Sequence, residues 1–304
     1  MSEDLGDVIR NGFDTYRHNL KISIPFLLYL LLISAILIPT AILLFTGRFE
    51  YEEIMPLWIL VLLLVLSLGF IFLAGAAGMA REATLEGKTS LRTMWIEGKA
   101  HFLQVLFAAV GFFVILMIGM FALLNPLFII GDAAGSVIIF LVFIPMMLIF
   151  LLFAMALGYI VPISIVVDNL GAFEGIGIGI GFIGSNKRDV LLISLLYLAA
   201  SIAIELSVVI IIFGASAIFG FEDLLHLESE EYPNLLSISS NLVELVVLYP
   251  LFVVLWTRLY MDRTGKLGEE VAETPLQETP TDQKEDQDAG LERELEGAPE
   301  RDLT

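Results

Sequence analysis

Six long apolar stretches constrain this chain more than any other feature of its sequence. Each is rich in leucine, isoleucine, valine and phenylalanine, and they span residues 22–45, 57–80, 102–124, 137–161, 190–214 and 238–261. About 20 predominantly apolar residues are enough for a helix to cross the hydrocarbon core of a bilayer. None shows the alternation of a barrel strand, and a helix bonds all of its backbone groups internally. The sequence therefore predicts an all-α fold, a polytopic membrane bundle of six transmembrane helices.

The composition excludes several other classes of protein. Hydrophobic residues make up 58% of the chain and charged residues 17%, which is too apolar for an ordinary soluble domain. Lys and Arg total 16 against 35 Asp and Glu, so we expect no nucleic-acid partner. The chain has no cysteine, and we find no catalytic or metal-binding motif in it. We therefore expect a protein that is not an enzyme and that carries no cofactor and no metal.

The basic residues predict how the chain crosses the cell membrane. Between the spans they fall almost entirely on one side, which receives Arg10, Arg17, Lys21, Arg81, Lys88, Arg92, Lys99, Lys187, Arg188, Arg258, Arg263 and Lys266. The other side receives only Arg48. Cytoplasmic loops carry the excess of Lys and Arg in membrane proteins, so we expect both termini in the cytoplasm.

The chain divides into two parts of different composition. Residues 1–263 hold all six spans and form the predicted transmembrane domain. Residues 264–304 hold 13 acidic and 4 basic residues, three prolines and no aromatic residue. Such a segment cannot bury enough apolar surface to offset its chain entropy, so we predict a disordered, acidic cytoplasmic tail.

Three cytoplasmic segments resemble one another and predict a threefold internal repeat. Gly12, Gly98 and Gly179 occupy the same place in each, and Asn19 corresponds to Asn186. Each segment precedes a pair of spans, which gives a unit of one amphipathic helix and two spans with a period of roughly 80–86 residues. Amphipathic helices of this kind lie in the headgroup plane of a bilayer. They serve either as plain anchors or as elements that gather lipid headgroups.

Two sequence segments resemble a known family. The first is the opening helix with Gly12-Phe13-Asp14-Thr15-Tyr16-Arg17-His18-Asn19; the second runs from Tyr159 to Asn169 and leads through a glycine-rich turn to Ser185-Asn186-Lys187-Arg188. Over residues 1–263 the chain is similar to uncharacterised archaeal six-span membrane proteins related to the membrane domain of some glycerophosphoryl diester phosphodiesterases. The soluble phosphodiesterase domain is absent from this sequence. The resemblance therefore implies a membrane domain without hydrolase activity.

Two acidic residues inside the spans form the candidate site. Glu205 lies in the fifth span and Glu244 in the sixth, at similar predicted depth, and a carboxylate within the bilayer by default suggests a functional site. Ser201 precedes Glu205 by one helical turn, and Ser240 and Asn241 precede Glu244 by one turn. Two close carboxylates share a proton or a cation. The alternative is that each is protonated and hydrogen-bonds between helices.

These observations lead to two functional hypotheses. The first is a non-enzymatic membrane domain that organises lipids or partner proteins at the cytoplasmic face. The alternative is a proton- or cation-coupled transporter that uses Glu205 and Glu244. The expected partners are membrane lipids and either a second copy of the chain or another membrane protein.

Overall fold

The computed structural model describes all residues except 1–2, 46–50, 131–135, 220–234 and 268–304. Its elements in chain order are α1 (Leu5–His18), a 3-10 turn (Leu20–Ser23), α2 (Ile24–Phe45), α3 (Tyr51–Glu86), α4 (Leu91–Ile130), α5 (Ser136–Asp168), α6 (Ala172–Ser185), α7 (Lys187–Phe219), α9 (Leu235–Val243), a π turn (Glu244–Leu248) and α10 (Tyr249–Arg263). The chain divides into two compact units, Met1–Gly265 and Lys266–Thr304. Nearly all of the predicted tail, 264–304, lies outside the described residues, so its disorder stays a prediction.

Within the described residues, six helices are long and apolar enough to cross a membrane, which confirms the predicted fold class. They comprise Leu20–Thr40, Ile59–Glu86, Leu91–Asn125, Phe143–Asp168, Lys187–Ile211 and Ser239–Arg263. Several continue beyond a hydrocarbon core: α3 has 36 residues and α4 has 40, which at 1.5 Å per residue is about 54 and 60 Å. The chain is thus a multi-pass membrane protein by the length and composition of its helices.

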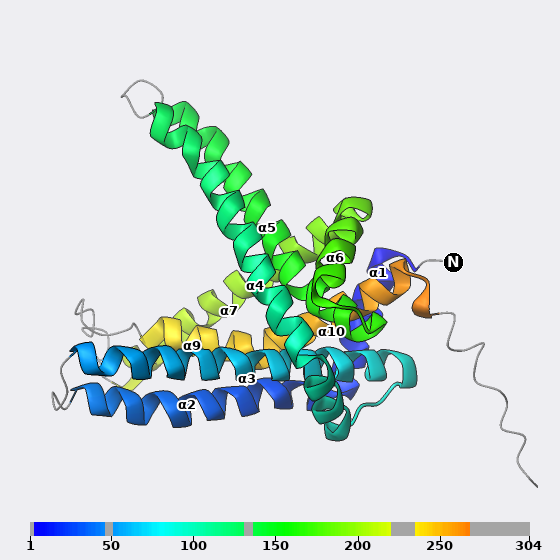
Figure 1. The fold of residues 1–304 in the computed structure, drawn as a ribbon, viewed down its shortest axis with the longest axis horizontal. Helices are drawn as coiled ribbons and strands as arrows, with labels where there is room; N and C mark the ends of the chain where they lie inside the picture. Colours follow the sequence, from blue (N-terminus) through cyan, green and yellow to red (C-terminus); the bar gives the residue numbers. More distant parts are fainter. Residues whose placement is uncertain (1–2, 46–50, 131–135, 220–234, 268–304) are drawn as a thin grey trace, which may run out of the picture. The chain divides into compact units, whose positions relative to one another are not determined.

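The buried core lies at one end of the helices. Its fully buried residues fall near the end of α3, the end of α5 and along α10, in the stretches 74–80, 159–166 and 252–257. These three helices contact one another, and each is buried on all sides there. Four alanines of α3 allow this close approach: Ala74, Ala76, Ala77 and Ala80. We call this end of the molecule, which also carries α1 and α6, the core end (Figure 1).

The three repeated glycines mark equivalent contacts and support the threefold plan. The three units are α1–α3, α4–α5 and α6–α10. A Cβ atom added at each glycine would lie closer than 3.0 Å to an atom in the second span of the preceding unit, and for the first unit the preceding unit is the third. The distances are 2.6 Å from Gly12 to Leu255 Cδ2 of α10, 2.7 Å from Gly98 to the Ile71 carbonyl oxygen of α3, and 2.9 Å from Gly179 to Val161 Cγ2 of α5. The first unit therefore packs on the third and closes the ring.

Two of the three predicted amphipathic segments are separate helices, and the second is not. Asn19 follows α1 and Asn186 follows α6 with similar backbone angles, and each side chain donates a hydrogen bond to the carbonyl four residues earlier. Val105 stands at the corresponding place in the second unit, within α4. Because valine has no side-chain amide to bond the backbone, the helix continues there without a break.

Candidate functional site

Glu244 opens a π turn in the sixth span. The Tyr249 amide donates to the Glu244 carbonyl five residues back, and the turn covers Glu244–Leu248. Pro250 follows directly, and a proline inside a helix removes one hydrogen bond and crowds the carbonyl four residues earlier. The π turn thus lies just before this proline in the chain. Single π turns frequently lie at functional sites.

Ser201 bonds to Glu244 across two helices. The Ser201 hydroxyl of α7 donates a short hydrogen bond to Glu244 Oε1, and both side chains are half-buried. The sequence associated Ser201 with Glu205, its neighbour one turn later on the same helix. The structure instead assigns this hydroxyl to the carboxyl group of the other span. Spacing along one helix does not reveal such a contact, because it depends on how the two helices face each other.

The other three candidate residues, Glu205, Ser240 and Asn241, are not part of the Ser201–Glu244 hydrogen bond. Glu205 is exposed and, within the described residues, has no hydrogen-bond or ion-pair partner. Its Cα lies about 6 Å along α7 from that of Ser201. Ser240 is buried and Asn241 is exposed. The structure thus joins Glu244 to Ser201 and shows no direct bond between the two carboxyl groups.

A cluster of aromatic side chains lies about one helical turn from Ser201 and Glu244. The sequence analysis did not identify this cluster. Tyr159, Tyr197 and Tyr249 lie with ring centroids 6.1–6.2 Å apart, and Trp256 stacks on Tyr159 at 6.3 Å. The Tyr159 hydroxyl and the Trp256 indole nitrogen are buried without a hydrogen-bond partner among the described residues. Three tyrosines inside three predicted spans were the available signal, because tyrosine normally sits nearer the membrane surface.

Several basic residues that the sequence assigns to the same side of the membrane form ion pairs at the core end. Arg258 Nη2 lies 2.7 Å from Glu3 Oε1, and Arg263 Nη2 lies 2.8 Å from Asp189 Oδ2. The hydrogen bond from Arg258 lowers the pKa of Glu3 below its ordinary value, against the opposing effect of burial. These pairs tie the chain start and the beginning of α7 to the end of α10.

A second group links α3, α4 and α5. Arg81 donates to the Val166 carbonyl and forms a 2.8 Å ion pair with Glu97, which also contacts His101 at 3.2 Å. Arg81, Arg258 and Arg263 therefore hold the fold together internally. Among the described residues, no group of three His, Cys, Asp or Glu could hold a metal ion.

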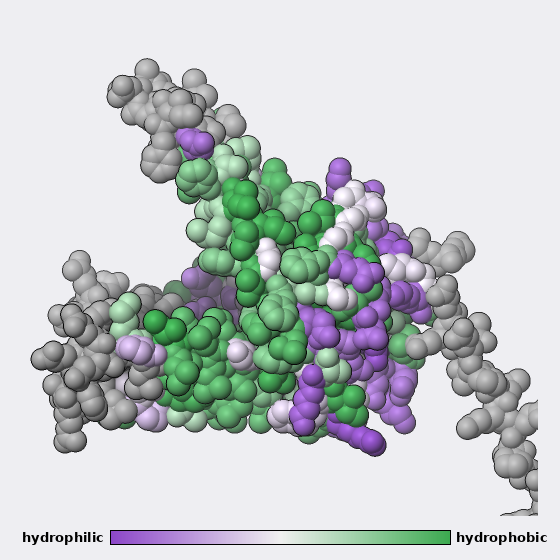
Figure 2. All heavy atoms as spheres, viewed as in Figure 1, coloured by the Kyte–Doolittle hydropathy of each residue, from purple (hydrophilic) through white to green (hydrophobic). Residues whose placement is uncertain are grey.

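The remaining basic residues of the core end face outward beside exposed apolar side chains. The exposed basic residues are Arg10, Arg17, Lys21, Lys88, Arg92, Lys99, Lys187 and Arg188. The exposed apolar neighbours include Phe13, Leu20, Trp95, Ile96 and Phe173. Figure 2 shows hydrophilic atoms gathered at this end and hydrophobic atoms along the long helices. Such a mixture of basic and large apolar residues is typical of a surface in the headgroup region.

Two cavities lie near this end. One of about 380 Å³ lies between α1, α7 and α10, and one of about 200 Å³ lies between α3, α4 and α5. Neither is lined by Glu205 or Glu244. Both of these cavities therefore offer apolar space near the exposed basic residues.

Comparison with known proteins shows the family of the chain. It belongs to the family described as a domain of unknown function (DUF7847), whose model matches residues 7–262. No curated protein and no solved structure matches the chain. The family description names no activity, so the resemblance to the membrane domain of glycerophosphoryl diester phosphodiesterases stays a prediction.

Proposed function

We propose that the chain is a non-enzymatic membrane domain that gathers phospholipid headgroups at its core end. One observation carries this proposal: exposed basic residues and exposed large apolar residues share the same end of the molecule. At this end, Arg81, Arg258 and Arg263 form ion pairs that join different segments of the fold. The outward-facing Lys and Arg form no ion pair with the residues that the structure describes, and each is worth about 1 kcal/mol of attraction to an anionic membrane surface.

The proposal includes the orientation of the chain in the cell membrane. The core end carries the excess of Lys and Arg, so it faces the cytoplasm together with both termini. The absence of cysteine makes this simple to test, because any introduced cysteine is the only one. We expect a membrane-impermeant maleimide to label Arg48→Cys and not Lys88→Cys in intact cells. The reverse labelling pattern would show that the orientation is wrong.

Trp95 provides a direct probe of the lipids at the core end. Its side chain is 45% exposed at the start of α4, and Lys99 lies over its ring at 6.0 Å. The chain also holds Trp58 and Trp256. In vesicles that contain either dansyl-labelled phosphatidylglycerol or dansyl-labelled phosphatidylcholine, the part of the tryptophan energy transfer that Trp95→Phe removes reports which lipid gathers there. We expect stronger transfer to the anionic lipid, and a decrease at high salt because screening weakens the attraction of exposed charges.

Variants distinguish headgroup attraction from simple proximity. The double variant with Arg92→Gln and Lys99→Gln removes two exposed charges beside Trp95 and is expected to weaken the preference by up to about 2 kcal/mol. Arg48→Gln, on the opposite side by sequence, is the matched control and is expected to leave the preference unchanged. Equal transfer to both lipids in the unaltered protein would contradict the proposed function.

A second candidate function rests on Glu244. This carboxyl group lies in a π turn within the sixth span and accepts a hydrogen bond from the fifth, which suits the binding and release of a proton or cation. In proteoliposomes with a pH-sensitive dye inside, this alternative expects a proton or cation flux that Glu244→Gln abolishes. Glu205→Gln reports whether the exposed carboxyl group takes part. A flux that survives Glu244→Gln, or no flux under imposed gradients, rejects the transporter.

A further inference from the structure

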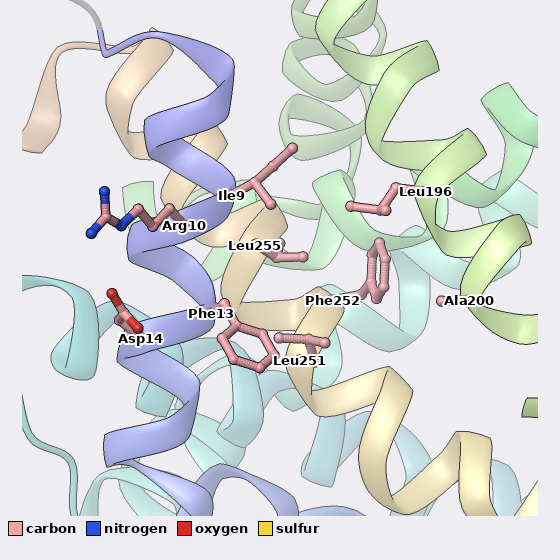
Figure 3. Close-up of a pocket in the computed structure, with 9 residues that line it drawn as sticks. All are labelled: Ile9, Arg10, Phe13, Asp14, Leu196, Ala200, Leu251, Phe252 and Leu255. Carbon is pink, nitrogen blue, oxygen red and sulfur yellow. The ribbon is translucent and has the colours of Figure 1, made fainter. Parts of the chain in front are cut away.

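An apolar groove lies beside α1 at the core end, and we call it the α1 groove. Figure 3 shows its walls, which come from three helices: Ile9 and Phe13 of α1, Leu196 and Ala200 of α7, and Phe252 and Leu255 of α10. Its volume of about 380 Å³ falls within the range of ligand pockets in proteins.

On α7 the groove is lined by a single helical turn, Leu196 and Ala200, which lies within the fifth candidate span. Leu196 and Ala200 lie 9 and 13 residues after Lys187, the first residue of α7. At 1.5 Å per residue, they are about 14 and 20 Å along the helix from its basic start. The walls there are apolar throughout. Water is therefore poorly accommodated at this depth, because a bound water needs two to four polar partners.

The only charged residues of the groove lie at its rim on α1. Arg10 and Asp14 are one helical turn apart and both side chains are exposed; in Figure 3 their charged ends extend from α1 on the side away from Leu196 and Ala200. The groove thus combines an apolar interior with one cationic and one anionic side chain on the exposed helix beside it. An apolar space beside exposed charged groups suits a phospholipid, which has apolar chains and a charged headgroup.

Comparison with the third unit explains why the groove exists. The equivalent helix α6 packs against both spans of its neighbouring unit, α4 and α5, whereas α1 packs closely against α10 and not against α7. On α4, Gly111 admits Ile176, the counterpart of Ile9, so closely that a Cβ atom would lie 2.9 Å from its Cδ1. On α7, no glycine precedes Gly214 and bulky leucines occupy the matching stretch. Leu196 of this stretch lines the groove, and the space between α1 and α7 is unfilled there.

We propose that the α1 groove binds one hydrocarbon chain of a phospholipid whose headgroup carries a hydrogen-bond donor. The Arg10 guanidinium binds the phosphate, and the Asp14 carboxylate accepts from a hydroxyl or ammonium group of the same headgroup. This inference rests on the proposed function, because it requires the core end to lie among headgroups. It adds a single defined binding site to a surface that otherwise attracts lipids by charge alone.

Native mass spectrometry of the full chain in mild detergent with added phosphatidylglycerol tests the site. Ala200→Leu fills the groove, and Ala199→Leu places the same side chain on the exposed neighbouring position. We expect one phosphatidylglycerol molecule to remain bound in the unaltered protein and in Ala199→Leu, and to be lost in Ala200→Leu. Arg10→Gln is expected to weaken retention about tenfold, since a hydrogen bond to a charged group is lost. Arg17→Gln, exposed on the same helix but not part of the groove, is its control.

A second measurement keeps the test independent of how well Ala200→Leu folds. In Ala200→Cys, the introduced thiol is expected to react more slowly with a maleimide when phosphatidylglycerol is added, whereas the thiol of Ala199→Cys keeps its rate. Equal retention in Ala200→Leu and Ala199→Leu, or equal thiol rates with and without lipid, overturns the groove site. So does an occupant that proves to be detergent or a second copy of the chain. Because Trp95 and its neighbouring charges lie outside the groove, their energy-transfer result separates a failure of this site from a failure of the proposed function.

Discussion

Gly98→Ala is expected to destabilise the protein although alanine is the better helix former. Gly98 lies where α4 crosses α3, and a Cβ atom there would stand 2.7 Å from the Ile71 carbonyl oxygen. A backbone oxygen cannot rotate away as the end of a side chain can, so the helices must separate. Overpacking of this kind costs about 1–3 kcal/mol. Helix propensity returns up to about 1 kcal/mol, and taking the upper end of the packing cost leaves a net loss of about 2 kcal/mol.

Two other glycines provide the comparison. Gly181 is exposed on α6 with no atom within 4 Å of its Cβ position, so Gly181→Ala should gain up to about 1 kcal/mol from propensity alone. At Gly12 the nearest atom is the flexible Leu255 Cδ2 at 2.6 Å, so Gly12→Ala should fall between the two. The expected separation between the Gly98 and Gly181 variants is therefore about 3 kcal/mol.

Unfolding of the purified variants in mild detergent, followed by tryptophan fluorescence, measures this ranking. The comparison uses one fold, one detergent and one type of substitution, so differences in the unfolded state largely cancel. If Gly98→Ala unfolds at or above the midpoint of Gly181→Ala, the close approach of α4 to α3 is wrong, and with it the repeated packing of the three units.

Three further predictions follow from single contacts. Ser201→Ala leaves the half-buried Glu244 carboxyl group without its interhelical donor and should cost about 1–3 kcal/mol in the same unfolding assay; an unchanged midpoint would contradict the bond. The pKa of Glu3 is lowered by Arg258, so its stabilising contribution is complete above the ordinary carboxyl pKa and is lost as pH falls through the lowered value. Because the pair is partly exposed, we expect at most about 1 kcal/mol, and Glu3→Gln should flatten this acid-side decline. Asn19→Ala removes both bonds from this side chain to the loop between α3 and α4 and should speed limited proteolysis of that loop; an unchanged cleavage rate would argue against its bridging role.

The position of the core has a consequence for how the spans are held. Fully buried stretches lie near the core end of α3, α5 and α10, whereas many side chains farther along the helices are exposed. Exposed leucines and isoleucines there face lipid in a membrane and need no protein partner. The assembly thus depends on contacts at the end that carries the charges, where packing and ion pairs act together.

The sequence by itself determined the number of spans and their approximate limits, and it predicted a repeated unit whose second amphipathic segment is part of the long helix α4. Twenty or more apolar residues in a row have few stable alternatives to a membrane-spanning helix, because every backbone group must be bonded within the segment. The repeated glycines were also visible, since only glycine permits so close an approach of two helices at these positions. The correspondence of Asn19 with Asn186 was also visible in the sequence, because each residue ends a helix by a hydrogen bond within its own segment.

Only the tertiary structure decided which side chains meet. Ser201 lies one turn from Glu205 and yet bonds to Glu244, and three of the basic residues that predicted orientation are ion-paired inside the fold. The groove beside α1 likewise depends on the distance between two helices that are nearly 200 residues apart in the chain. Hydropathy and spacing act along one helix, whereas these contacts depend on the relative rotation and separation of different helices, which is set by the packing of the whole core end.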